Sequence, residues 1–284
     1  MGGVGDSRRL AKLVMKTSCI IVVKIHAYAQ SQFCLIKLPE LFFRSMRYSL
    51  LSGGKRIRAC LCLACCELMG GQAEDALPFA AALEMIHAYS LIHDDLPAMD
   101  NDDMRRGKPS SHKAFGEGNA ILAGDGLLTM AMRLLCDVPG QEAAKKAVFQ
   151  GALEMAAGQS LDLNVTARDL PSLQRIHDLK TGALFRSACL SGAYRGGCDQ
   201  AEAEKIRLFA DKLGLLFQMT DDLLDRDKDA AENKLTYVTL LGTEETRRQI
   251  DSLRSDIHGI LSEYSGEAAA YLAVLTDRVA VRNV

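Results

Sequence analysis

One segment of the chain is apolar on all sides at helical spacing and then ends in two adjacent carboxylates. Residues 79–95 read FAAALEMIHAYSLIHDD. A helix that is apolar all round is normally buried inside a large protein. Asp94 and Asp95 therefore end a buried helix, where an unpaired carboxylate is very unfavourable. The segment predicts a core helix of a large helical protein whose carboxylates need compensating cations.

Most of the chain shows the same helical period. Apolar residues recur at i, i+3, i+4 and i+7 over further long segments, which are 120–135, 172–194, 201–225 and 246–264. Glycine and proline pairs separate them, and strand-like alternation is scarce, with one ambiguous β-branched patch at 20–23. No repeat or linker divides the 284 residues. We predict an all-α protein with a single domain over 1–284 and about ten helices.

Composition and charge exclude several classes of function. The net charge is −2, with 34 basic against 36 acidic residues, so we expect no general affinity for nucleic acid. The nine cysteines include the apolar run CLCLACC but offer no second CxxC pair for zinc. We interpret them as reduced thiols packed in a core, which favours a cytoplasmic location. The apolar run at 19–23 is far shorter than the about 20 residues of a membrane span, so we expect none.

A second acidic cluster repeats the pattern of the first. The segment FQMTDDLLD at 217–225 is otherwise apolar, and it carries Asp221, Asp222 and Asp225. On a helix Asp221 and Asp225 share a face, and Gln218 lies one turn before Asp222. Carboxylate clusters without basic partners of their own need cations, and oxygen ligands that also accept water and phosphate suit Mg²⁺. Two exposed helix ends are the alternative, which the repetition disfavours.

Basic residues supply the other half of an anion site. Lys55 and Arg58 lie three residues apart in GGKRIR, and Arg105 and Arg106 directly follow the first acids. Lys180 occupies an apolar position of its helix, where an extended side chain reaching the surface is the alternative. GGKR does not match the GxxxxGK[ST] pattern of a P-loop. Metal-binding carboxylates beside several arginines and lysines indicate a diphosphate ligand.

A proline changes the geometry of the first cluster. Asp94 and Asp100 are six residues apart, so on a regular helix they point in different directions. Pro97 disfavours helix at the preceding residue and removes one backbone hydrogen bond. We predict a two-residue bulge that returns Asp100 to the side of Asp94. Asp102 and Asp103 are then interpreted as solvated acids.

Seven ordered motifs carry a resemblance to a known family. They are GGKRIR, HAYSLIHDDLPAMDNDDMRRGKPSSH, AILAGDGLL, GQSLDL, HDLKTGALF, FQMTDDLLD and NKLTYVTLLG. Over roughly 46–242 they closely resemble the short-chain trans-isoprenyl diphosphate synthases, and most of all the bacterial farnesyl diphosphate synthases. The resemblance implies the class I terpenoid synthase fold, with the two aspartate motifs facing each other at the mouth of a central cavity. Residues 1–45 form a divergent N-terminal segment that resembles nothing diagnostic.

The resemblance also implies an activity. It is the Mg²⁺-dependent condensation of an allylic diphosphate, dimethylallyl or geranyl, with isopentenyl diphosphate to give C15 farnesyl diphosphate and free diphosphate. Three Mg²⁺ ions and a homodimer are implied as well. The alternatives are a geranylgeranyl or geranyl diphosphate synthase, a terpene cyclase, and a non-catalytic partner subunit. GGKRIR argues against a cyclase, and two intact acidic clusters argue against a lost site.

Roles for individual residues follow from the resemblance. The expected metal ligands are Asp94, Asp95, Asp100, Asp221, Asp222 and Asp225. The expected diphosphate-binding residues are Lys55, Arg58, His87, Arg105, Arg106 and Lys234, of which Arg105 matches the contact to the allylic diphosphate. The expected residues around the ionising bond and the developing carbocation are Lys180, Thr181 and Gln218. The expected chain-length residues are Tyr89 and Ser90.

Tyr89 bears on product length. It lies five residues before Asp94, about 7–8 Å along a helix axis at about 1.5 Å per residue. A ring at this depth would form the floor of the cavity. An aromatic residue at this place together with DDxxxxD resembles the family pattern for a C15 product. Ordinary core packing is the alternative interpretation of this residue.

The loop after the second cluster departs from the family pattern. Only seven residues, RDKDAAE, separate Asp225 from NKLTY, and Asn233 stands where glycine is usual. Lys228 is therefore not assigned a role. A non-catalytic subunit would result if the short loop at 226–234 abolished activity.

Overall fold

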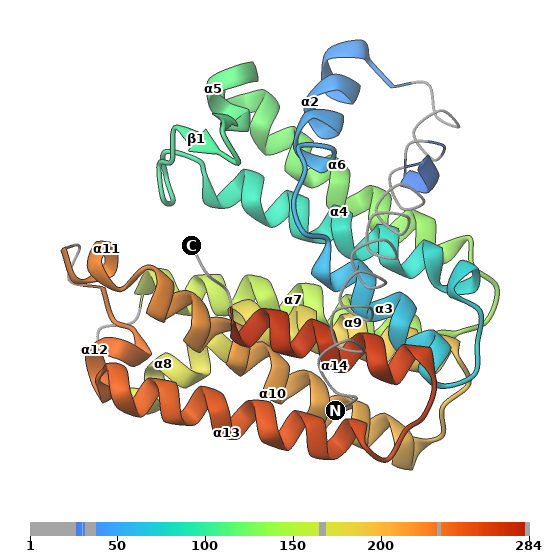
Figure 1. Ribbon diagram of the computed structural model, residues 1–284. Helices are drawn as coiled ribbons and strands as arrows, with labels where there is room; N and C mark the ends of the chain where they lie inside the picture. The colour runs from blue at the N-terminus through green and yellow to red at the C-terminus, as the bar shows by residue number, and fades with distance from the viewer. Residues whose placement is uncertain (1–26, 30, 32–37, 165–168, 232–233, 282–284) are drawn as a thin grey trace.

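A computed structural model of the chain is almost entirely α-helical (Figure 1). The structure describes residues 27–29, 31, 38–164, 169–231 and 234–281. The β-branched patch at 20–23, much of the N-terminal segment 1–45 and Asn233 lie outside these residues. Within them, ten α-helices have eight or more residues, in agreement with the prediction of about ten helices.

The elements follow one another with short connections. The α-helices are α2 (Glu40–Leu50), α3 (Ile57–Leu68), α4 (Leu77–Asp94), α5 (Ser111–Phe115), α6 (Glu117–Cys136), α7 (Glu142–Asn164), α8 (Leu170–His177), α9 (Ala183–Arg195), α10 (Gln200–Leu224), α11 (Arg226–Ala231), α12 (Tyr237–Leu241), α13 (Thr243–Leu261) and α14 (Glu267–Ala280). A 3₁₀ turn, η1 (Ala73–Ala76), precedes α4, and a π-helical segment, η2 (Asp178–Gly182), separates α8 from α9. Strands β1 (Met104–Arg105) and β2 (Lys108–Pro109) form an antiparallel hairpin.

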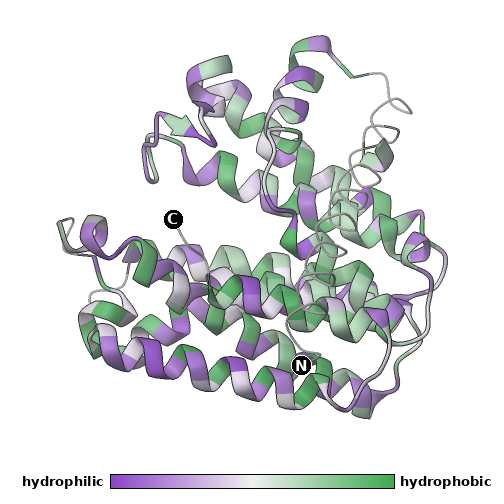
Figure 2. Ribbon diagram, viewed as in Figure 1, coloured by the Kyte–Doolittle hydropathy of each residue, from purple (hydrophilic) through white to green (hydrophobic). Residues whose placement is uncertain are grey.

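The core lies between helices that are apolar on most sides. α4 packs against α3, α6 and α9, and α7 packs against α9. Every residue of α4 from 79 to 86 is buried, as its all-round apolar sequence predicts. Full burial of a side chain such as Phe79 contributes about 1.5–3 kcal/mol. Figure 2 shows hydrophobic residues concentrated on these inner helices, whereas α13 is largely hydrophilic.

The cysteine run of α3 belongs to this core. Cys60, Cys62, Cys65 and Cys66 are buried and carry free thiols. Burial raises the pKa of the Cys66 thiol to about 11, so this thiol is protonated at neutral pH. The interpretation as core thiols is confirmed for these four residues and for Cys189, whereas it is wrong for Cys136, which is exposed.

Helix α6 is the one described helix that is long and apolar enough, by composition, to cross a membrane. Of its apolar 18-residue window, 44% is buried inside the protein, and the helix packs against α2 and α4. The core helix of a soluble protein passes the same test, so this composition is weak support for a span.

Candidate active site

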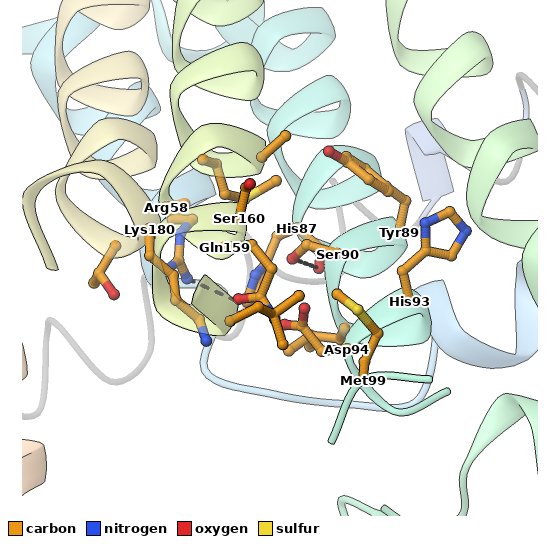
Figure 3. Close-up of a pocket in the computed structure, with 15 residues that line it drawn as sticks. Arg58, His87, Tyr89, Ser90, His93, Asp94, Met99, Gln159, Ser160 and Lys180 are labelled. Atoms are coloured by element: carbon orange, nitrogen blue, oxygen red, sulfur yellow. Dashed lines mark hydrogen bonds between the residues drawn. The ribbon is translucent and has the colours of Figure 1, made fainter. Parts of the chain in front are cut away.

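Two adjoining cavities lie beside the carboxyl end of α4. The larger, of about 390 Å³, is lined by seven of the predicted site residues, which are Arg58, His87, Tyr89, Ser90, Asp94, Lys180 and Thr181 (Figure 3). The smaller, of about 280 Å³, is lined by four of them, which are Lys55, Arg58, His87 and Arg106. Because Arg58 and His87 line both, the two cavities meet at these residues. Nine of the predicted site residues thus line one site with a basic compartment and a mainly apolar one.

The first acidic cluster lies where α4 ends. α4 stops at Asp94, and the chain turns at Pro97 until the backbone N–H of Asp100 donates to the carbonyl oxygen of Asp94 at 2.9 Å. Pro97 thus returns Asp100 to Asp94 as predicted, but by ending the helix and not by a bulge. Burial raises the pKa of Asp94 to about 6, Lys180 opposes this rise, and the charge of Asp100 adds to it. Carboxylates crowded in this way favour a bound cation.

The two arginines after this cluster lie on a β-hairpin that we did not predict from the sequence. Its turn has positive φ at both Arg106 (52°) and Gly107 (74°), as a type I′ turn requires. The Arg105 Nε donates to the Asp95 carboxylate at 2.9 Å, and its Nη2 lies 3.2 Å from Asp102. The hairpin therefore holds the Arg105 guanidinium against the buried Asp95. Asp102 is exposed, as predicted, although it pairs with Arg105.

The GGKR loop before α3 packs against this hairpin and against α4. A Cβ on Gly54, whose φ is +111°, would lie 2.9 Å from the Cζ of Arg106, so only glycine fits here. Arg56 also has left-handed backbone, with φ of 50°. Its Nη1 forms an ion pair of 2.7 Å with Glu84 of α4, and both side chains are only 2–3% exposed. This buried pair fixes the loop that carries Lys55 to the edge of the smaller cavity.

Arg58 and His87 stand between the two cavities. The Arg58 Nη1 lies 3.4 Å from the Nε2 of His87, and its guanidinium lies over the Phe185 ring, 5.1 Å from the centroid. Burial lowers the pKa of His87 well below its usual value, and the charges of Arg58 and Arg106 lower it further. His87 is therefore neutral at physiological pH and can donate a hydrogen bond to an anion through its N–H.

Lys180 and Thr181 lie on the π-helical segment η2, which interrupts the helix predicted over 172–194. π-Turns inside α-helices are frequent at functional sites. A Cβ on Gly158 of α7 would lie 2.2 Å from the backbone nitrogen of Lys180, and one on Gly214 of α10 would lie 3.2 Å from the same segment. Helices α7 and α10 thus hold η2 closely from two sides.

Arg186 of α9 holds the same segment by its charge. Its guanidinium pairs with the Asp178 carboxylate and also donates to the Asp178 carbonyl oxygen at 3.2 Å. It lies 3.0 Å from Asp211 of α10 and 3.3 Å from Glu154 of α7. One side chain therefore links η2 to both neighbouring helices.

The ammonium group of Lys180 points into the site. Figure 3 shows its side chain directed toward the region of Gln159 and Asp94. The Nζ lies 2.6 Å from a carboxylate oxygen of Asp162 on α7. The alternative of a lysine that reaches the outer surface does not apply, since Lys180 lines the larger cavity.

A chain of hydrogen bonds connects the second acidic cluster to the cavity. The Thr181 hydroxyl donates to the Oε1 of Gln218 at 3.2 Å, and the Nε2 of Gln218 donates to Asp222 at 2.9 Å. The other Asp222 oxygen accepts the backbone N–H of Tyr237 at 2.8 Å. Gln218 and Asp222 share a helix side, as predicted, but the link to Tyr237 has no signal in the local sequence.

The remaining predicted residues lie farther from the cavities. Asp221 is half-buried on α10, whereas Asp225 follows the end of that helix and is exposed. Lys234 is exposed, and its Nζ lies 3.6 Å from Asp229. Among the described residues, the lining of the two cavities does not include Asp95, Asp100, Arg105, Gln218, Asp221, Asp222, Asp225 or Lys234.

Helix α7 supplies cavity residues that the sequence analysis missed. Gln159 and Ser160 line the larger cavity together with Met155 and Leu163. Both polar atoms of the Gln159 amide are buried and have no hydrogen-bond partner within the described part of the chain. The signal for these residues was the motif GQSLDL, which we noted without assigning roles. A buried amide without a partner favours a polar ligand.

Tyr89 closes one side of the larger cavity. It is 9% exposed, and its ring meets the His93 ring edge to face, with centroids 5.7 Å apart and an interplanar angle of 83°. A Cβ on Gly124 of α6 would lie 2.1 Å from the His93 Nε2. The His93 ring therefore packs between Tyr89 and Gly124, at the interface of α4 and α6.

The acidic residues of the two clusters fit Mg²⁺ by their chemistry, and Asp94 lines the larger cavity. Their donors are carboxylate oxygens, which Mg²⁺ prefers, and it usually binds one or two of them together with water and substrate phosphates. Asp95 and Asp222 already accept hydrogen bonds from protein groups, so fewer of their oxygens are available to a metal ion. Over the described ranges, no group of three His, Cys, Asp or Glu side chains comes together as a metal site.

An all-α protein whose acidic helices border an apolar cavity lined by arginine, lysine and histidine has the architecture of an isoprenoid synthase. The polyprenyl synthetase family model matches residues 39–259, and the chain belongs to this family. The resemblance and the fold class predicted from the motifs are both confirmed.

Curated relatives and solved structures agree with this assignment. The chain is 42% identical to a chloroplastic geranylgeranyl pyrophosphate synthase of Capsicum annuum over 277 residues, which cover 90% of this chain and 75% of that protein. It is 41% identical to the heterodimeric geranylgeranyl pyrophosphate synthase large subunit 1 of Arabidopsis thaliana. The match covers 87% of this chain and 74% of that protein. A geranyltransferase of Legionella pneumophila superposes with a TM-score of 0.86 at 33% identity. The superposition covers 95% of this chain and 98% of that chain. An FPP/GFPP synthase of Zymomonas mobilis superposes with a TM-score of 0.84 at 34% sequence identity. The superposition covers 95% of this chain and 100% of that chain.

Proposed function

We propose that the protein is a Mg²⁺-dependent prenyltransferase that joins an allylic diphosphate to isopentenyl diphosphate and releases farnesyl diphosphate. The observation that carries this proposal is the pair of cavities that meet at Arg58 and His87. One is basic, and the other is mainly apolar with the Asp94 carboxylate in its lining. Such a pair suits two diphosphates whose hydrocarbon parts meet.

The basic cavity suits isopentenyl diphosphate. Lys55, Arg58 and Arg106 supply positive charge around it, and neutral His87 supplies a hydrogen-bond donor. Arginine binds phosphate through two parallel N–H groups, which also orients the ligand. The double bond of the substrate would then lie toward Arg58, where the cavities join.

The apolar cavity suits the allylic substrate, with its diphosphate near Asp94. The carboxylates of Asp94, Asp100 and Asp221 would hold Mg²⁺, and we propose three ions. The chemistry that bound Mg²⁺ supplies is neutralisation of the departing diphosphate, which lowers the barrier to breaking the allylic C–O bond. Lys180 adds a cation at the same place.

The chain's own residues then protect and direct the carbocation. Thr181 lines the cavity and bonds the Oε1 of Gln218, so oxygen atoms lie next to the developing positive charge. Apolar side chains such as Met155 and Leu91 exclude water. The allylic C–O bond breaks, the isopentenyl double bond forms the new C–C bond, and a proton leaves to the released diphosphate.

Tyr89 supports a C15 product, and the relatives favour a second candidate. The paired rings of Tyr89 and His93 limit the depth available to a growing chain. The chloroplastic relative, however, is named a geranylgeranyl pyrophosphate synthase, so a C20 product is the alternative. Product length distinguishes them.

The test is incorporation of labelled isopentenyl diphosphate with Mg²⁺ and either dimethylallyl or geranyl diphosphate. We expect a C15 diphosphate, and no product after EDTA treatment. Release of a cyclic hydrocarbon instead would indicate a terpene cyclase. A folded protein that incorporates nothing with either substrate would contradict the proposal and favour a non-catalytic partner subunit.

We also propose a homodimer. Helices α6 and α7 expose Leu122 and Leu153, each more than half accessible in the single chain. An Arabidopsis relative is named a heterodimeric large subunit, so a different partner chain is the alternative. Light scattering of the purified protein tests this: a mass near 62 kDa, twice the 30.9 kDa of the chain, is expected, and a mass near 31 kDa would contradict it.

A further inference from the structure

Asp222 occupies a position that resemblance assigned to metal binding, but its surroundings assign it another role. We propose that Asp222 is a positioning residue, which orients the side-chain amide of Gln218 so that its carbonyl oxygen faces the reacting carbon. This inference rests on the proposed function, because it concerns the same cavity.

Both carboxylate oxygens of Asp222 are already used by the protein. Oδ1 accepts from the Gln218 Nε2 at 2.9 Å, and Oδ2 accepts from the Tyr237 backbone N–H at 2.8 Å. The residue is only 4% exposed, whereas its neighbour Asp221 is half-buried. A carboxylate held from both sides in the protein interior is poorly placed to exchange its partners for a hydrated Mg²⁺ ion.

The hydrogen-bonding pattern fixes the direction of the Gln218 amide. An ionised carboxylate only accepts hydrogen bonds, so Gln218 must direct its NH₂ group toward Asp222. The geometry agrees, because the Gln218 Nε2 lies 2.9 Å from one Asp222 oxygen while the Tyr237 backbone N–H donates to the other at 2.8 Å. The Oε1 then lies on the other side, where the Thr181 hydroxyl donates to it at 3.2 Å.

The direction of this amide matters for the chemistry. Thr181 lines the cavity and donates to the Gln218 carbonyl oxygen, so the Gln218 dipole points toward the cavity side that carries Thr181, where we propose that positive charge develops. A dipole that is oriented before the reaction stabilises the transition state without reorganisation. If the amide turned over, its NH₂ group would face the carbocation and destabilise it.

Asp222→Asn removes one acceptor at nearly unchanged shape. The Asn amide retains an oxygen for Tyr237 and presents its NH₂ group to Gln218, which must then turn over. We expect kcat to fall about 10- to 100-fold, because an oriented dipole is lost. The half-saturating Mg²⁺ concentration should stay within about twofold of the wild type. The adjacent Asp221→Asn is the matched control and should raise the Mg²⁺ requirement.

A paired substitution tests orientation directly. In Asp222→Asn with Gln218→Glu, carboxylate and amide exchange places, so an oxygen again faces Thr181 and the net charge is unchanged. We expect this double variant to recover a substantial part of the kcat lost in Asp222→Asn. No recovery, or a Mg²⁺ requirement of Asp222→Asn as high as that of Asp221→Asn, would overturn the inference.

A readout independent of turnover separates this inference from the proposed function. The Gln218 side-chain NH₂ signal in ¹⁵N–¹H NMR spectra, assigned by its loss in Gln218→Leu, should be shifted by its carboxylate partner. Asp222→Asn should move that signal, and Asp221→Asn should not. Mn²⁺ binding followed by EPR with inorganic diphosphate should persist in Asp222→Asn. An unmoved signal or lost Mn²⁺ binding would contradict the positioning role even if the wild type showed no prenyl transfer.

Discussion

Gly158 of α7 lies directly against the backbone of Lys180. A Cβ at position 158 would approach the Lys180 nitrogen to 2.2 Å and its Cα to 2.7 Å. We therefore predict that Gly158→Ala displaces the π-helical segment, lowers kcat at least about tenfold and destabilises the fold by about 1–3 kcal/mol. Steady-state kinetics and chemical unfolding measure the two effects. Gly118→Ala on α6 is the control, since nothing lies within 4 Å of a Cβ there. Equal activity of the two variants would contradict the prediction.

Tyr89 provides a test of product length. Tyr89→Ala removes the ring that meets His93 and deepens the cavity, so products longer than those of the wild type are expected. Chromatography of the dephosphorylated products measures chain length. Tyr89→Phe retains the ring and should keep the wild-type product. Identical products from all three proteins would show that Tyr89 only packs in the core.

The buried Arg56–Glu84 pair provides a test of the diphosphate loop. Glu84→Gln leaves a buried cation without its partner, and we expect a loss of about 3–5 kcal/mol in unfolding free energy. We also expect the KM for isopentenyl diphosphate to rise more than the KM for the allylic substrate, because Lys55 lies on the same loop. The variant with both Glu84→Gln and Arg56→Met removes the unpaired charge. Its stability should exceed that of Glu84→Gln alone, and a further loss would contradict this account.

Asp94 makes a pH-dependent contribution to stability. Its pKa is raised by burial from 3.8 to about 6, so the folded, metal-free protein holds this proton more tightly than the unfolded chain. The stability due to Asp94 therefore grows as pH falls from 7.5 to 5. Burial lowers the pKa of His87 and His177 in the folded protein. Their contribution to the stability of the fold therefore decreases as pH falls below 6.5, which opposes the effect of Asp94.

A comparison with Asp94→Asn isolates the carboxylate from these histidines. The stability of Asp94→Asn minus that of the wild type, measured in EDTA, should be larger at pH 7.5 than at pH 5. The expected change is on the order of 1 kcal/mol. A difference that does not change with pH would rule out a raised pKa at Asp94.

Much of this protein could be predicted from its sequence, because the informative signals are local. The apolar segment 79–95 becomes the buried helix α4, and the segment 201–225 becomes α10. Arg58, His87 and Lys180, assigned through ordered motifs, meet at one cavity. Pro97 returns the chain so that Asp100 lies beside Asp94, as its restricted backbone predicts.

The features that the sequence did not reveal depend on contacts between distant segments. The periodicity of 172–194 is compatible with a continuous helix, and the π-turn lies where Gly158 and Gly214 of two other helices approach the backbone closely. Strands of two residues are too short to show alternation, so the hairpin at 104–109 was missed. The donor that Tyr237 gives to Asp222 comes from 15 residues farther along the chain.

The π-helical segment has a consequence for how this chain can change. A π-turn is equivalent to an α-helix with one residue inserted. Deleting one residue between 178 and 182 would join α8 and α9 into a regular helix, but it would rotate Lys180 and Thr181 relative to α7. Selection for stability and selection for activity therefore oppose each other at this position.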